Sequence, residues 1–139
     1  MKATIKWVED AQFLGESGSG HSVMMDGPPE IGGRNAGIRP MEMLLIGVGA
    51  CSSVDVVSIL KKARQNITGC EAKVEAQRVD AIPAVFEKIH MHFIVTGKDL
   101  DDAKVKRAVE LSAEKYCSAS IMLQKGGVQV THDYEIINE

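Results

Sequence analysis

The sequence predicts an α+β fold in one domain of residues 1–139, and three patterns carry this prediction. Stretches near the start and in the middle of the chain alternate apolar and polar residues, as strands with one buried face do. A long apolar run that begins at Pro40 predicts a helix, and an amphipathic repeat from Asp101 predicts another. The 139 residues suit a single domain with its own core.

Composition and charge exclude several classes of protein. Hydrophobic residues make up 45% and charged residues 25% of the chain, as in soluble globular proteins, and a net charge of -3 does not favour nucleic acid as a partner. The N-terminal MKATIKWVED lacks the apolar segment of a signal peptide. The longest apolar run, Met43 to Val48, is far shorter than the roughly 20 residues of a membrane span. We therefore expect a cytoplasmic protein with no membrane partner.

The N-terminal third reads as a small antiparallel meander followed by a loop. ATIKWVE alternates, and the turn-rich ESGSGH and DGPP divide the region into strands at about residues 2–9, 11–16 and 20–26. The segment GPPEIGGRNAGIRP, rich in glycine and proline, predicts a surface loop that carries Arg34 and Arg39. Long loops in compact domains are often functional.

The next element is a helix from Pro40 to about Gln65. Proline suits a first helical turn, and Lys61, Lys62 and Arg64 lie where the helix dipole favours cations. Apolar residues surround the first half on every side, which predicts a helix enclosed by protein. About 25 residues would extend near 37 Å, long for a small domain, so a partner subunit would be a natural cover.

Two long strands follow the helix. ITGCEAKVEAQRV places Cys70 on the apolar face, where packing is its expected role, and FEKIHMHFIVTG directs Ile89, Met91, Phe93 and Val95 inward. His90 and His92 share the other face. Their spacing would allow a metal ion, but no third ligand is evident, so we expect solvent-facing histidines and no metal site.

The chain then returns to helix and closes with a strand. DDAKVKRAVELSAEKYC has acidic residues at the positive end of the helix dipole and a helical apolar repeat, and predicts a helix from Asp101 to near Cys117. A shorter helix, SASIMLQK, and a last strand, GVQVTHDYEII, complete the chain.

The three cysteines limit the chemistry that the chain can carry. An odd number without CxxC or CxxH spacing, in a reducing compartment, argues against structural disulfides and zinc. Cys51 in ACSS and Cys117 in YCSAS have small neighbours that leave room at sulfur. If their helices pack together, a thiolate could be oxidised to a sulfenic acid that the second thiol captures as a disulfide. Two cysteines that share a core by chance would look the same in sequence.

Three features follow one another along the chain: PMEMLLIGVGACSS, the strand pair after it, and SAEKYCSASIML. In this order they resemble the OsmC/Ohr family (osmotically inducible protein C and organic hydroperoxide resistance proteins), in particular its OsmC-like uncharacterised bacterial branch. The resemblance covers nearly the whole chain. It implies an intertwined homodimer with antiparallel sheets wrapped around long central helices and with active sites at the subunit interface.

The resemblance also implies an activity, that of a thiol-dependent peroxidase acting on organic hydroperoxides. Cys51 would be the peroxidatic thiolate and Cys117 the resolving thiol, with a dithiol such as a lipoylated protein as reductant and no cofactor. The alternative keeps the dimer without the chemistry: an interface pocket that binds a small apolar or electrophilic ligand.

The chain departs from the family pattern at two positions. The family glutamate that follows the helix-starting proline is Met41 here, and the acid is Glu42. Glu42 is a possible activating residue, but it lies nine residues before Cys51, on nearly the opposite side of a helix that turns about 100° per residue. We therefore expect it to be a partner of the helix dipole at the N-terminus or an interface residue rather than the catalytic acid. The family arginine of the early strands is absent from FLGESGSGH, and Arg34 or Arg39 is the candidate to activate Cys51 in its place.

Overall fold

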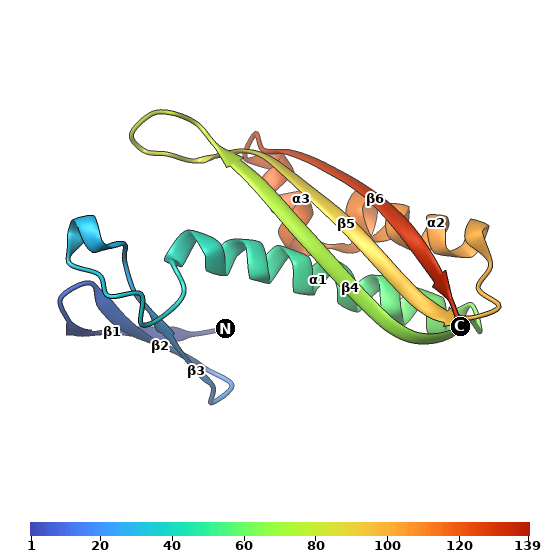
Figure 1. Cartoon of the computed structure of the whole chain (residues 1–139), viewed down its shortest axis with the longest axis horizontal. Helices are drawn as coiled ribbons and strands as arrows, with labels where there is room; N and C mark the ends of the chain where they lie inside the picture. The colour runs from blue at the N-terminus through green and yellow to red at the C-terminus, as the bar shows by residue number, and fades with distance from the viewer. The chain divides into compact units, whose positions relative to one another are not determined.

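The computed structural model describes all 139 residues, which form two compact units, Met1–Leu44 and Leu45–Glu139 (Figure 1). The first unit holds a three-stranded sheet and a loop. The second holds a longer sheet and most of the helical residues. A single helix, α1 (Pro40–Lys62), contains the point at which the chain passes from one unit to the other.

The sheet of the first unit confirms the predicted meander. It contains β1 (Ala3–Glu9), β2 (Gln12–Ser17) and β3 (Ser22–Met25), paired antiparallel in chain order. A short 3-10 helix, η1 (Pro29–Ile31), lies in the loop that follows β3.

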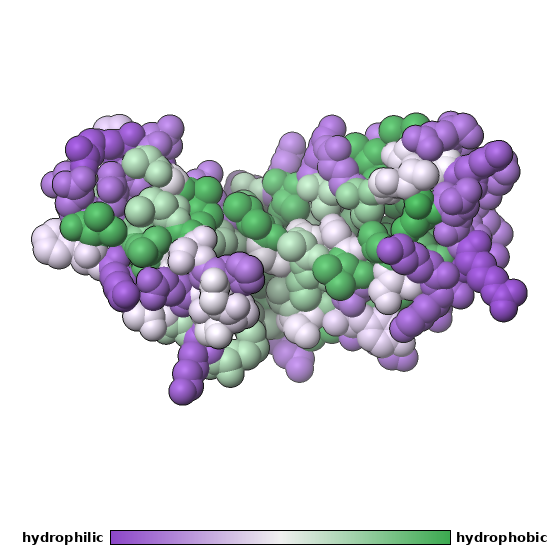
Figure 2. All heavy atoms as spheres, turned by 90° about the horizontal axis from the view of Figure 1, so that it is seen from below, coloured by the Kyte–Doolittle hydropathy of each residue, from purple (hydrophilic) through white to green (hydrophobic).

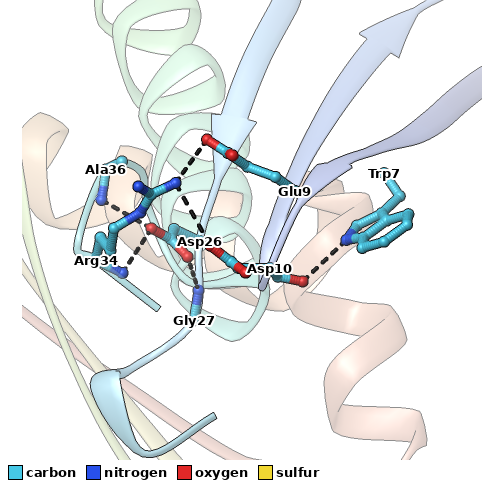
Figure 3. Close-up of polar contacts among 7 residues, drawn as sticks. All are labelled: Trp7, Glu9, Asp10, Asp26, Gly27, Arg34 and Ala36. Atoms are coloured by element: carbon cyan, nitrogen blue, oxygen red, sulfur yellow. Dashed lines mark hydrogen bonds and ion pairs between the residues drawn. The ribbon is translucent and has the colours of Figure 1, made fainter. Parts of the chain in front are cut away.

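That loop is anchored by the buried carboxylate of Asp26 (Figure 3). Its Oδ1 accepts the backbone N–H of Gly27 at 2.7 Å, and its Oδ2 accepts those of Arg34 and Ala36, each at 3.0 Å. These bonds, the one from Ala36 foremost, hold the pKa of Asp26 below its ordinary value because they favour the charged form. A side chain at Gly33 would collide with the carbonyl of Gly27, so only glycine permits this close approach.

Helix α1 begins at the predicted residue, and its first turn is capped by Glu42. The Glu42 carboxylate accepts the backbone N–H of Arg39 at 2.7 Å, which satisfies a donor at the helix start that has no helical acceptor. Lys61 and Lys62 occupy the last turn.

The expectation that α1 is enclosed on every side is wrong for the single chain. Its buried residues form one stripe: Val48, Gly49, Ser52, Val56 and Leu60. Large apolar side chains elsewhere on it are open to solvent, 54% exposed for Ile46 and 68% for Val54. Apolar residues are visible on the face of the molecule drawn in Figure 2.

The apolarity of α1 extends beyond the short run on which the sequence argument relied. An 18-residue window of the helix has a mean hydropathy of 2.0, so its length and composition alone would suit a membrane span. The core helix of a soluble protein meets the same two criteria, so they do not distinguish the two environments.

The sheet of the second unit contains β4 (Asn66–Arg78), β5 (Phe86–Lys98) and β6 (Gln129–Asn138) in that order. β4 and β5 form an antiparallel hairpin, but β6 runs parallel to β5, so the expectation of antiparallel sheets fails for this strand. The helices between β5 and β6 carry the chain back before β6 begins (Figure 1). The predicted inward residues of β5 are buried: Ile89, Met91, Phe93 and Val95.

The predicted helix that ends near Cys117 is present but changes its geometry in the last turn. α2 (Asp102–Leu111) is regular, and a π-helical turn, η2 (Ser112–Tyr116), follows it. The N–H of Cys117 donates to the carbonyl of Ser112 at 2.8 Å, a bond across five residues. Cys117 itself is extended and caps α3 (Ser118–Lys125).

Candidate thiol site

Cys51 lies in the middle of α1, half-buried at the margin of the stripe that packs on the sheet. The glycines around it differ in role. A Cβ at Gly49 would lie 2.9 Å from Val74 Cγ2, so glycine here lets α1 approach β4 closely. A Cβ at Gly47, one turn before Cys51, would have no atom within 4 Å apart from its chain neighbours and the adjacent backbone of its own helix. The helix surface is therefore open at Gly47.

Cys117 is fully buried and its sulfur is held by two neutral donors. Ser52 Oγ donates to Cys117 Sγ at 3.0 Å, and the backbone N–H of Ser120 donates to it at 3.3 Å. Ser112 Oγ in turn donates to the Ser52 carbonyl at 2.9 Å. Serines from α1, η2 and α3 thus fix the position of this thiol.

The structure brings Cys51 and Cys117 together, both as free thiols. Burial is the main reason that the pKa of Cys117 is raised, and the adjacent Cys51 side chain raises it further. The bonds from Ser52 and Ser120 oppose this shift without reversing it. Cys117 is therefore protonated at neutral pH, and the more accessible Cys51 is the better candidate for first contact with an oxidant.

The two candidate activating arginines have partners within the first unit. Arg34 donates to Glu9 at 2.6 Å and lies 3.5 Å from Asp10, and these carboxylates raise its pKa (Figure 3). Arg39 donates to Asn35 Oδ1 at 3.1 Å. Both guanidinium groups are already engaged by loop and strand residues of their own unit.

Cys70 lies half-buried rather than deep in the core. It borders a shallow pocket of about 450 Å³ with Ser53, Val54, Val57, Ser58 and Lys61. Burial raises its pKa, which favours the unreactive thiol form.

The outer face of the second sheet shows a cluster that the sequence pattern did not predict. Asp133 Oδ1 accepts from His92 Nδ1 at 2.7 Å and lies 3.0 Å from His90 Nε2. The bond from His92 is the main cause of the lowered pKa of Asp133. Local sequence spacing could not predict this cluster, because the parallel pairing of β5 and β6 places residues about 40 positions apart side by side.

The serines that hold Cys117 were also missed from sequence. Ser52 follows Cys51 directly, so its position suggested only a small neighbour. Its role depends on the packing of α1 against η2 and α3, which local patterns do not encode.

Comparison with known proteins agrees with this architecture. Residues 32–133 match the family model described as OsmC-like protein. The chain is 52% identical over 140 residues to Protein YhfA of Escherichia coli (strain K12), with 99% of this chain and 98% of that protein covered.

Two solved structures share the fold. A hypothetical protein from Aquifex aeolicus VF5 has a TM-score of 0.85 at 29% identity, with 99% of this chain and 96% of that chain covered. The organic hydroperoxide resistance protein OhrB of Bacillus subtilis has a TM-score of 0.63 at 22% identity, with 96% of each chain covered. The family match and the identity to YhfA over nearly the full length establish that this chain belongs to the OsmC-like protein family.

Proposed function

We propose that this protein is a thiol-dependent peroxidase that reduces organic hydroperoxides through Cys51 and Cys117. The observation that carries the proposal is the pair itself: a half-buried thiol on α1 next to a fully buried thiol that serines hold in place. The family membership and the likeness to a hydroperoxide resistance protein support the same class of substrate.

The reaction balances with these two residues and one peroxide. The Cys51 thiolate attacks the terminal oxygen of the hydroperoxide, the O–O bond breaks, and Cys51 becomes a sulfenic acid while an alkoxide leaves. The Cys117 sulfur then attacks the Cys51 sulfur, the S–O bond breaks, and water leaves as the disulfide forms. Two thiols and one hydroperoxide yield a disulfide, an alcohol and water. An external dithiol, such as a lipoylated protein, would restore the thiols by exchange.

We further propose that the working form is a homodimer. The exposed apolar side chains of α1, Ile46 and Val54 among them, form a surface that a second copy would cover. The serine donors at Cys117 carry no charge, so they do not supply the positive charge that would activate Cys51. An adjacent cation would favour the Cys51 thiolate, and Arg34 or Arg39 remains the candidate for this role. The capping bond of Glu42 indicates that this residue acts at the helix terminus.

The test is to treat the reduced protein with cumene hydroperoxide and count free thiols. We expect the parent to lose two thiols per hydroperoxide consumed. Cys51→Ser should lose none, and Cys117→Ser should lose only the Cys51 thiol. Cys70→Ser is the matched control and should behave as the parent. A parent protein that keeps all its thiols at stoichiometric peroxide would refute the proposal.

A further inference from the structure

Ser52 and Ser53 are neighbours in α1, but their hydroxyl groups bind in different directions. Ser53 Oγ donates to the carbonyl of Gly49 at 2.8 Å, four residues back in its own helix, as helical serines often do. Ser52 Oγ instead donates out of the helix, to Cys117 Sγ at 3.0 Å. The Ser52 hydroxyl therefore joins α1 to the residue that caps α3.

The backbone of Ser52 is also fixed at this contact. Ser52 is fully buried, and its carbonyl accepts the Ser112 hydroxyl at 2.9 Å. Since Ser52 follows Cys51 directly, one turn of α1 carries both the thiol that is proposed to react first and the hydroxyl that holds the second sulfur. This arrangement links the positions of the two sulfur atoms.

The bond from Ser52 has two effects on Cys117, and both concern its attack on the neighbouring sulfur. A side chain held by a hydrogen bond has fewer orientations to search before it reacts. Burial raises the pKa of Cys117, and the bond from Ser52 is the largest effect that lowers it. A donor to sulfur favours the thiolate, which is the nucleophilic form. The attack on peroxide takes place at Cys51 and depends on neither effect.

We propose that Ser52 is a positioning residue that acts through Cys117 and speeds the closure of the disulfide, an inference that rests on the peroxidase function proposed above. In this step the Cys117 sulfur attacks the Cys51 sulfur and the S–O bond breaks. The hydroxyl group of the sulfenic acid leaves as water with the proton of the Cys117 thiol.

The rate of closure decides the fate of Cys51. A sulfenic acid that is not captured reacts with a second hydroperoxide, which transfers one oxygen to sulfur and leaves as the alcohol. Cys51 is then a sulfinic acid, which a dithiol does not reduce. By speeding closure, Ser52 protects the reusable form of Cys51.

The experiment treats the reduced parent, Ser52→Ala and Ser53→Ala with cumene hydroperoxide in the presence of dimedone, which traps sulfenic acids. Mass spectrometry measures the ratio of the dimedone adduct on Cys51 to the disulfide between Cys51 and Cys117. Ser52→Ala should raise this ratio by about 3- to 10-fold, the factor that one neutral hydrogen bond supplies, while the initial rate of hydroperoxide loss stays that of the parent. Ser53→Ala is the matched control and should equal the parent, because its bond stays within α1.

A double variant tests whether Ser52 acts through Cys117. With excess hydroperoxide, Ser52→Ala should increase the yield of Cys51 sulfinic acid relative to the parent. In the Cys117→Ser background no disulfide between these two residues can form, so Ser52→Ala should leave the yield unchanged. An increase in that background would show a direct effect on Cys51 and would overturn the proposal.

The remaining outcomes separate this inference from the proposed function. A parent that does not consume hydroperoxide overturns both. A parent that forms the disulfide, with an equal trapping ratio in Ser52→Ala, overturns the role of Ser52 alone, as does a changed rate of hydroperoxide loss in this variant. Circular dichroism and Tm check the fold, which alanine is expected to preserve because it favours helix and leaves the carbonyl that binds Ser112 in place.

Discussion

The two sulfur atoms differ in exposure, and this difference distinguishes their roles in the proposed reaction. Cys117 is fully buried among serine donors, with a raised pKa, so it is poorly suited to meet a substrate first. It is well suited to capture a sulfenic acid on the adjacent Cys51, because the serine bonds hold its sulfur in one position. Cys117 therefore contributes to the proposed reaction through the position of its sulfur and not through the acidity of its thiol.

A second residue-scale feature, Asp26, leads to a prediction of pH-dependent stability. The pKa of Asp26 is lowered from 3.8, so its stabilising effect is present above that value and is lost as the pH falls through the lowered pKa. Asp26→Asn should reduce the stability of the first unit at neutral pH, since an amide oxygen cannot accept all three N–H groups and its NH₂ opposes one of them.

Trp7, the only tryptophan, lies in the same unit, so its fluorescence during urea titration reports this change. The difference between parent and Asp26→Asn should shrink as the pH is lowered from about 5 to about 2. Asp80→Asn, in the exposed β4–β5 loop, is the control. A difference that is independent of pH would show that the charge of Asp26 does not stabilise the loop.

Sequence patterns identified the cysteines but not what surrounds them. Cys51 and Cys117 stood out through their neighbours and their place in the predicted helices. Ser112 and Ser120 act through contacts between elements that are distant in the chain, and the bonds of Asp133 depend on strand pairing. Local spacing carries no signal for such contacts.

At the scale of elements, the packing of α1 on β4 depends on Gly49. An alanine there would place Cβ 2.9 Å from Val74 Cγ2. Overpacking costs roughly 1–3 kcal/mol, and the better helix propensity of alanine returns about 1 kcal/mol. We therefore expect Gly49→Ala to lower the free energy of unfolding by about 1 kcal/mol.

Val74→Ala supplies the control because it removes the methyl groups that would collide. In the double variant, the added cost of Gly49→Ala should disappear, so chemical denaturation would show a coupling of about 1 kcal/mol or more. Strictly additive effects would mean that α1 does not approach β4 at this point.

Strand and helix positions followed from periodicity, but two features of the elements did not. The π-helical turn at Ser112–Tyr116 keeps the apolar repeat of a helix, so the pattern cannot distinguish it from regular α-helix. The direction of β6 depends on the connection through α2 and α3, and alternation along a strand has no direction.

At the scale of the whole molecule, the exposed apolar surface of α1 predicts association of two chains. Val54 is 68% exposed, and a charge there would be buried without a partner if a second copy covers the helix. Val54→Glu should therefore shift the protein from dimer to monomer in analytical ultracentrifugation.

Met122→Glu on α3 is a matched control, because Met122 is 66% exposed and also lies on a helix. It should leave the dimer intact. A parent that sediments as a monomer, or a Val54→Glu variant that stays dimeric, would contradict the assignment of α1 as the interface.

The central claim is that Cys51 and Cys117 form one redox couple, and the intact mass of the protein after one equivalent of cumene hydroperoxide tests it most directly. The parent should lose the mass of two hydrogen atoms, with peptide mapping placing the disulfide between Cys51 and Cys117. Cys117→Ser should instead gain one oxygen atom on Cys51. An unchanged parent mass, or a disulfide that involves Cys70, would contradict the account.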